Sequence, residues 1–126
     1  MKLTRYREFQ SFVPQPGVRL LGFESDRFKT IRARVYLLTP IEPHVATENS
    51  LLARVLRAGT ENHPTRRELA RACEELYGAT LGIGVSRFAD TQALVATVDF
   101  PSDRFLPKGS KELEGALSLL VELLTK

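Results

Sequence analysis

The regular alternation of side-chain type along residues 29–38 is the feature that most restricts the fold of this chain. Its odd positions from 31 to 37 are apolar, and its even positions from 30 to 36 are polar, charged or aromatic. Successive side chains of a β-strand point to opposite faces of its sheet, so a period of two residues indicates a strand. One face of this strand should join the core, and the other should be at least partly in water.

Three further segments have the composition of strands. The run 17–23 follows an extended lead segment, 1–16, that ends at Pro16, and a turn at 24–26 is expected to join this run to 29–38. Apolar residues alternate again at Leu81, Ile83 and Val85, and at Leu94, Ala96, Val98 and Phe100. The Ala89-Asp90 break between these two runs predicts an antiparallel hairpin.

Three segments have helical periodicity instead. The first carries Leu51, Leu52, Val55 and Leu56 and ends at Gly59; the second carries Leu69, Ala72, Cys73 and Leu76; the third carries Leu113, Ala116, Leu117, Leu120, Val121 and Leu124. Thr65 and Glu68 have the spacing of a capping box at the start of the second helix, and Gly78 should end it. Ser110 is the expected cap of the third helix.

The order of elements is therefore β-β-α-α-β-β-α. This order predicts an α+β fold, in which a mainly antiparallel sheet has its helices packed on one face. At 126 residues, the chain has the size of a single domain spanning 1–126.

Composition restricts the function. The 18 Lys and Arg are scattered among 15 Asp and Glu, without the block of like charges typical of a nucleic-acid tail, so a nucleic-acid partner is not expected. The single cysteine, Cys73, cannot form an internal disulfide, and its place on an apolar helical stripe favours a small core residue over a nucleophile. No apolar run approaches the roughly 18 residues of a membrane span, which predicts a cytoplasmic protein without a membrane partner.

Three stretches of the chain together resemble one family. They are Ser50-Leu-Leu-Ala-Arg-Val-Leu-Arg-Ala-Gly-Thr60, Pro64-Thr-Arg-Arg-Glu-Leu69 and Glu74-Glu-Leu-Tyr-Gly-Ala79. In this combination the chain resembles the insulinase, or pitrilysin, family of metallopeptidases, which includes processing proteases, over about residues 17 to 126. Active members carry H-x-x-E-H on the first helix, followed by a Gly-Thr pair.

Gly59-Thr60 sets the register of this resemblance. Counted back from the pair, the two metal-binding histidines fall on Ser50 and Arg54, and the catalytic glutamate falls on Ala53. Two imidazoles one helical turn apart hold zinc in such sites, and the carboxylate accepts a proton from the metal-bound water. Ser50 is a poor ligand, Ala53 cannot accept a proton, and Arg54 would repel the ion.

The resemblance thus implies a pseudoenzyme without catalytic residues, metal or other cofactor, and with no peptidase activity of its own. The family's third ligand, a downstream glutamate, would lie beyond Lys126. Members are also much longer, which implies an N-terminal fragment of a longer chain. Noncatalytic members pair with catalytic ones, so the expected partners are a peptide or protein segment and a catalytic insulinase-type subunit, or a second copy of the chain.

Two alternatives from the residues stay open. His44 and His63 could belong to an active site that Glu48, Glu68 or another chain completes, although isolated histidines in loops are more often surface residues. Arg66, Arg67 and Arg71 could bind an acidic partner, although pairing with Glu68, Glu74 and Glu75 is the more common arrangement.

The strand 91–100 could offer an exposed edge to an extended peptide or to self-association.

Overall fold

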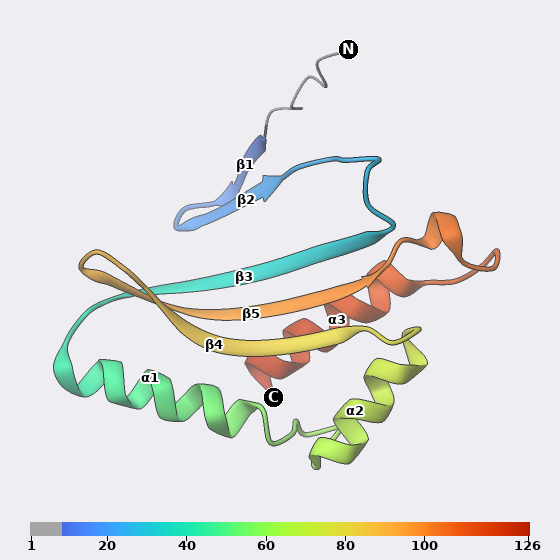
Figure 1. Ribbon diagram of the computed structural model, residues 1–126. Coiled ribbons are helices and arrows are strands. Elements are labelled where there is room, and N and C mark those ends of the chain that lie inside the picture. The colour runs from blue at the N-terminus through green and yellow to red at the C-terminus, as the bar shows by residue number, and fades with distance from the viewer. Residues whose placement is uncertain (1–8) are drawn as a thin grey trace.

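The computed structural model describes residues 9–126, which form one three-stranded sheet, one separate two-stranded hairpin and three α-helices (Figure 1). The elements, in chain order, are β1 (Gln10–Gln15), β2 (Val18–Gly22), β3 (Thr30–Pro40), α1 (Pro43–Leu56), α2 (Arg66–Glu75), β4 (Thr80–Phe88), β5 (Thr91–Pro101), a 3₁₀ turn (Asp103–Phe105) and α3 (Glu112–Thr125). From β2 onward the helices and strands follow the predicted order, and the α+β fold class is confirmed.

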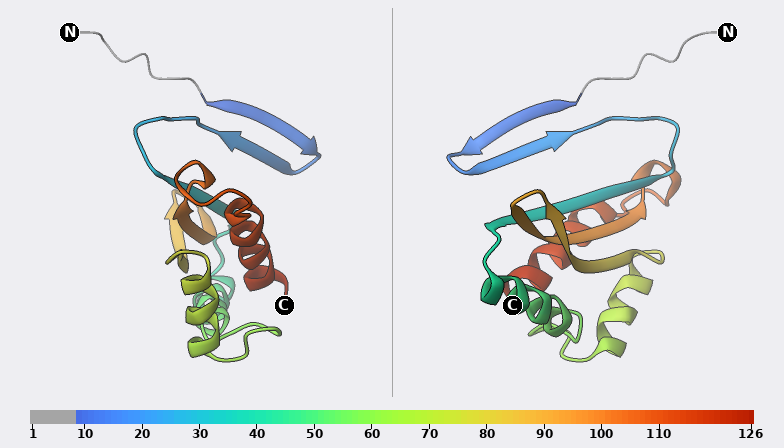
Figure 2. Two further views of the ribbon diagram at one scale, coloured as in Figure 1. Left: turned by 90° about the vertical axis from the view of Figure 1, so that its right-hand side faces the viewer. Right: turned by 60° about the vertical axis from the view of Figure 1, so that its left-hand side comes forward.

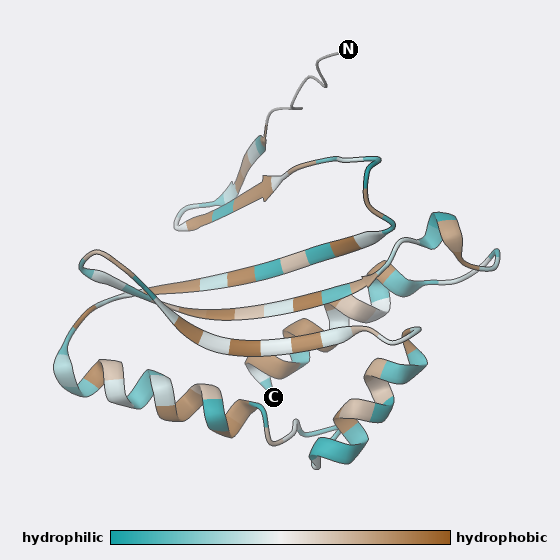
Figure 3. Cartoon of the chain, in the orientation of Figure 1, coloured by the Kyte–Doolittle hydropathy of each residue, from teal (hydrophilic) through white to brown (hydrophobic). Residues whose placement is uncertain are grey.

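The main sheet is antiparallel, with the strand order β3-β5-β4. Ala96 of β5 stands opposite Val35 of β3 on one side and Ile83 of β4 on the other, so the apolar positions of all three strands are in phase. The inward side chains of β5 are almost fully buried: Leu94, Ala96, Val98 and Phe100 are each no more than 4% exposed. Figure 3 shows the resulting alternation of hydrophobic and hydrophilic residues along these strands.

All three helices contribute to the core on that same face of the sheet (Figure 2). Their buried apolar residues are Ala53 of α1, Leu69 of α2, and Ala116, Leu119, Leu120 and Leu123 of α3. Burying a leucine or phenylalanine side chain of this kind stabilises a fold by about 1.5–3 kcal/mol. The prediction that helices cover one face of the sheet is therefore confirmed, although Leu119 and Leu123 were missed.

The first pair of strands differs from the prediction. The run 17–23 does not pair with 29–38; β2 pairs with β1, a strand that lies inside the predicted lead segment, and β3 pairs with β5. Pro16 and Gly17 form the turn between β1 and β2, and Gly17 has a φ of 81°, which suits the third position of a type II turn. Residues 1–8 of the predicted lead segment lie outside the described residues.

The helix ends are partly as predicted. The Thr65–Glu68 capping box at the start of α2 is present in both directions. Ser110 does not cap α3, because its hydroxyl donates a hydrogen bond to the carbonyl of Pro107 and Lys111 occupies the cap position. Of the apolar residues predicted for α1 and α3, the following are exposed: Leu51, Leu52, Val55, Leu113, Leu117 and Val121.

The strand 91–100 was expected to offer a sheet edge to a peptide, and this prediction is wrong. This segment is β5, which lies between β3 and β4 and is hydrogen-bonded to both of them. Its backbone groups are therefore not available to an added strand. The edges of the sheet are β3 and β4. Within residues 9–126, no helix has the length and apolar composition that a membrane span requires.

Candidate functional site

The three positions to which the resemblance assigns metal ligands and a general base, Ser50, Ala53 and Arg54, all lie on α1. The Ser50 hydroxyl donates a hydrogen bond of 3.0 Å to the carbonyl of Ala46 in its own helix. Ala53 is 4% exposed and belongs to the core that α1 forms with the sheet. Arg54 is exposed to solvent. The helix is thus complete and packed, and position 53, to which the resemblance assigns a general base, holds a buried methyl group.

The two histidines lie at opposite ends of α1 and cannot share an ion. His44 is in the first turn, exposed, with its Nε2 3.5 Å from the Glu42 carboxylate. His63 follows the end of this 14-residue helix, which is about 20 Å long. Within residues 9–126 there is no cluster of three or more His, Cys, Asp or Glu side chains that could hold a metal ion.

A tight turn after α1 fixes the end of that helix against α3. The amide of Thr60 donates to the His63 carbonyl at 2.8 Å, and the amide of His63 donates to the Thr60 hydroxyl at 3.0 Å. A side chain at Gly59 would collide with this turn, because its Cβ would lie 2.6 Å from the carbonyl carbon and oxygen of Pro64. The Gly-Thr pair therefore has a structural role in this chain.

Glu122 of α3 holds this turn in place. Its carboxylate accepts hydrogen bonds from the Thr60 hydroxyl and lies 2.9 Å from Nδ1 of His63. Burial alone would raise the pKa of Glu122, but hydrogen bonds with Thr60, His63 and Asn62, together with the charge of His63, lower the pKa below its ordinary value. We call Thr60, His63 and Glu122 the polar clasp, because Thr60 and His63 both contact the Glu122 carboxylate. In a nucleophile activated by a base, the hydroxyl would instead donate its hydrogen bond to the histidine.

A second polar cluster joins α1 to the sheet and was missed at the level of sequence. The Asn49 side-chain amide donates to Oε1 of Gln92 at 2.9 Å and to the Thr39 hydroxyl at 3.2 Å. Gln92 is 7% exposed, so this amide pairing satisfies a buried polar group and sets how α1 lies against β3 and β5. No local pattern marks these residues, because each of the three comes from a different element.

Arg57, just after α1, closes part of the β4 edge. Its guanidinium donates through Nε, at 2.7 Å, and through Nη2 to the carbonyl of Ile83. Beside it, a depression of about 390 Å³ lies between α2 and β4 and is lined by Arg57, Arg66, Leu69, Cys73, Gly82 and others. Cys73 is half-buried, and this burial raises the pKa of its thiol, so the reactive thiolate is disfavoured, in line with its predicted role in packing.

With this geometry in place, comparison with known proteins gives two matches. The chain is 28% identical, over 100 residues and 79% of its length, to the probable inactive metalloprotease YmfF of Bacillus subtilis strain 168. It superposes with a TM-score of 0.87 on the crystal structure of a conserved protein from Enterococcus faecalis V583, at 28% identity and over 91% of the chain. No protein-family model matches the chain.

The chain spans about a quarter of the length of both proteins: 24% of the Bacillus protein and 27% of the Enterococcus protein. By sequence, the chain is thus similar to part of a protein described as a probable inactive metalloprotease, and by fold it is similar to part of the Enterococcus protein.

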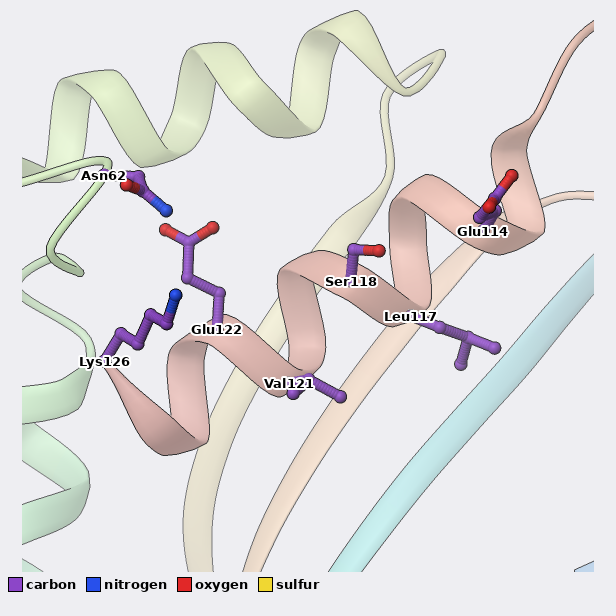
Figure 4. A pocket seen from close by; sticks show the side chains of 7 residues that line it. All are labelled: Asn62, Glu114, Leu117, Ser118, Val121, Glu122 and Lys126. Carbon is purple, nitrogen blue, oxygen red and sulfur yellow. The ribbon is translucent and has the colours of Figure 1, made fainter.

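The outer face of α3 carries a second, open depression of about 460 Å³ (Figure 4). Glu114, Leu117 and Val121 line it along the helix, and Asn62 and Glu122 close one end where the polar clasp lies. Ser118 and Lys126 complete its lining, so that Asn62, Glu122 and Lys126 gather at one end and the apolar side chains of Leu117 and Val121 lie along the helix. It is an open depression on the surface of the helix.

The charged residues of α2 do not pair as expected. Arg66, Arg67 and Arg71 are exposed, and within residues 9–126 none of them forms an ion pair with a glutamate. Glu68 instead accepts hydrogen bonds from Thr65 at the start of the helix. Since hydration of exposed charges offsets most of the gain of a surface ion pair, this arrangement costs little stability.

Proposed function

We propose that this chain is a noncatalytic, insulinase-type peptidase-like domain that serves as the structural or peptide-binding half of a dimeric zinc peptidase. The observation that carries the proposal is the state of α1. The helix is well formed, packed on the sheet and fixed at its end by the Gly59 turn, while its three motif positions hold Ser50, Ala53 and Arg54. A helix of this form with these three residues supports a peptidase-like scaffold without the catalytic residues of the family.

The burial of Ala53 makes this proposal more specific than the sequence alone allows. A general base must reach the metal-bound water, whereas residue 53 faces the core and is 4% exposed. A glutamate placed there would carry its charge into apolar surroundings at a large cost. Because the packing of α1 is adapted to a small apolar residue at this position, the loss of the base is accommodated by the structure.

The sequence comparison supports the noncatalytic, peptidase-like part of this proposal. The Bacillus relative is described as a probable inactive metalloprotease. The assignment to the insulinase type rests on the residues around Gly59-Thr60, and the partner role rests on the resemblance to a family in which noncatalytic chains accompany catalytic ones. A partner chain with an intact H-x-x-E-H helix would supply the zinc site.

Zinc binding and peptidase activity of the purified protein test the noncatalytic assignment. Zinc content is measured after dialysis against one equivalent of zinc, and cleavage of a mixture of unstructured peptides is followed by mass spectrometry with and without a chelator. The proposal expects no tightly bound zinc and no cleavage. Stoichiometric zinc together with chelator-sensitive cleavage would overturn it and would favour an active site completed by His44 or His63.

The partner role needs a separate measurement. An insulinase-type chain with an intact motif, encoded in the same genome, is assayed for peptide cleavage alone and with this chain added. The proposal expects cleavage to rise on addition and a complex to be seen by sedimentation. Unchanged activity and two separate sedimenting species would contradict the partner role and leave the noncatalytic assignment intact.

A further inference from the structure

Glu112 is a carboxylate that the fold encloses without a hydrogen-bond donor. It is the first residue of α3 and is only 5% exposed. Its Oε2 is buried, and no group within residues 9–126 donates a hydrogen bond to it. An anion in such a position loses its hydration without compensation, whereas the neutral acid loses much less. The surroundings of Glu112 therefore favour its protonated form.

Asp103 shares the start of α3 with Glu112. Its Oδ1 accepts a hydrogen bond of 3.2 Å from the Glu112 amide, one of the free amides that stabilise a negative charge in the first turn of a helix. The charge of Asp103 also opposes a second negative charge close by. Burial, and then the charge of Asp103, raise the pKa of Glu112 above its ordinary value of 4.5.

The cations of this region do not pair with Glu112. Within residues 9–126, it forms no ion pair with a lysine, an arginine or a histidine. Lys29 and Arg104 lie instead over the Phe105 ring, 5.5 and 5.9 Å from its centroid. Two further lysines precede α3 and are exposed to solvent: Lys108 and Lys111.

β5 and α2 present apolar side chains to this part of α3. On β5, Phe100 is buried on the helix side, whereas Asp99 points to the other face of the sheet and pairs there with Arg32 at 2.6 Å. α2 approaches the first turns of α3 through the apolar side chain of Leu76. Since the side chains around the carboxylate belong to this chain, its burial does not depend on polypeptide outside residues 9–126.

The connection 102–111, between β5 and α3, depends on this corner of the structure (Figure 1). The backbone hydrogen bonds of its turns stay inside the connection. Its first residue, Ser102, donates to the Lys29 carbonyl at 2.8 Å and is thereby tied to the sheet. In the described part of the chain, the bond from the Glu112 amide to Asp103 is the hydrogen bond that ties the 3₁₀ turn to α3.

We propose that Glu112 is a proton switch that controls the docking of the connection 102–111 onto α3. As the neutral acid, its side chain keeps its buried position and its amide keeps the bond to Asp103. When the proton passes to water, the charged carboxylate turns out into solvent, this bond breaks, and the 3₁₀ turn separates from the helix. The inference goes beyond the proposed function, because it assigns a pH response to a part of the fold that holds none of the motif positions.

The pH range of the switch follows from the direction of the pKa shift. The folded protein holds the proton of Glu112 more tightly than the unfolded chain does, so protonation stabilises the fold. This stabilisation is complete below pH 4.5, the ordinary pKa, and is lost as the pH rises from there through the folded-state pKa.

The test follows Glu112 in the whole protein by NMR. The carboxyl carbon of Glu112 is titrated, and hydrogen exchange of its amide is measured over the same pH range and corrected for the intrinsic exchange rate. The midpoint is expected above pH 4.5, and protection of the amide should fall about tenfold or more through that midpoint. A midpoint at or below pH 4.5, or protection that stays constant through the midpoint, would overturn the proposal.

Three variants separate the switch from a general effect of charge. Glu112→Gln fixes the neutral form, so protection of the amide at residue 112 should no longer depend on pH. Asp103→Asn keeps an acceptor for that amide and removes the neighbouring charge, so the midpoint of Glu112 should move down toward 4.5. Glu114→Gln neutralises an exposed glutamate on the same turn and should leave both the midpoint and the protection unchanged.

The variants can also refute the switch. Wild-type pH dependence of protection in Glu112→Gln would show that another group controls the connection. Equal shifts of the midpoint in Asp103→Asn and Glu114→Gln would show that net charge alone governs the titration. None of these measurements involves zinc or a partner chain, so failure of the switch is distinguishable from failure of the noncatalytic assignment.

Discussion

Replacing Glu122 by alanine should loosen the turn that follows the motif helix. The carboxylate accepts hydrogen bonds from Thr60 and His63, and hydrogen bonds to a charged group contribute about 1.5–3 kcal/mol each. Its removal also leaves the Thr60 hydroxyl, in a residue that is 6% exposed, without its acceptor on α3. Discounting for the partial exposure of His63, we expect Glu122→Ala to lower the free energy of unfolding by about 3 kcal/mol.

Urea and thermal unfolding measure this loss. With an unfolding entropy of about 2 cal/mol/K per residue, the expected change in the melting temperature is about 12 °C. Glu114→Ala is the matched control, because it removes an exposed glutamate from the same helix and should change stability by less than about 0.5 kcal/mol. A loss below about 1 kcal/mol for Glu122→Ala, or equal losses in both variants, would refute the assigned role of the clasp.

The clasp also predicts a pH dependence. Although burial opposes it, the hydrogen bonds with Thr60, His63 and Asn62 lower the pKa of Glu122 in the folded state below its ordinary value of 4.5. A carboxyl group with a lowered folded-state pKa stabilises the fold above the unfolded-state pKa, and this stabilisation is lost as the pH falls through the folded-state pKa. The stability difference between the wild type and Glu122→Gln should therefore be constant near pH 6 and shrink below about pH 4.5.

Three other substitutions check separate parts of the structure. Gly59→Ala should cost about 2 kcal/mol or more in urea unfolding, because its Cβ would lie 2.6 Å from the carbonyl of Pro64. Arg57→Met should cost about 1–2 kcal/mol, and sedimentation should show more self-association once the Ile83 carbonyl is exposed. Glu112→Gln should raise the free energy of unfolding by about 1 kcal/mol at pH 7, because burial and the nearby Asp103 raise the pKa of Glu112 and disfavour its charged form. This gain in stability should disappear toward pH 4, where Glu112 of the wild type is protonated.

The parts of the fold that sequence predicts are those set by local period. Alternation along 29–38 and 91–100 assigns each side chain to a face, and the structure keeps these assignments because a shift of one residue would expose every apolar position. Strand pairing is not a local property. The run 17–23 was paired with its nearest downstream neighbour, whereas the Pro16-Gly17 turn brings the preceding residues back to it first.

In the candidate site, too, sequence predicts what depends on local spacing and misses contacts between residues far apart in the chain. Ser50, Ala53 and Arg54 can be placed on α1 from sequence, because helical periodicity predicts this helix and the resemblance counts the three positions back from Gly59-Thr60. The contacts of Glu122 with Thr60, and of Gln92 with Asn49, join residues 62 and 43 positions apart, and an isolated polar residue in a sequence is usually a surface residue. Arg57 was missed for the same reason: its significance comes from the strand edge that it covers.

The exposed surface of the chain is larger than that of a compact monomer of the same mass. It exposes 9930 Å², whereas an ordinary monomer of 14.1 kDa exposes about 6700 Å². The excess of roughly 3000 Å² is several times the 800 Å² or so that one partner contributes to a standard interface. Leu51 and Val55 on α1 and Leu38 on β3 are each more than half exposed, so apolar surface is part of this excess. Exposed apolar surface of this extent is typical of a segment that packs against further polypeptide, and the chain spans about a quarter of the length of both proteins that it matches.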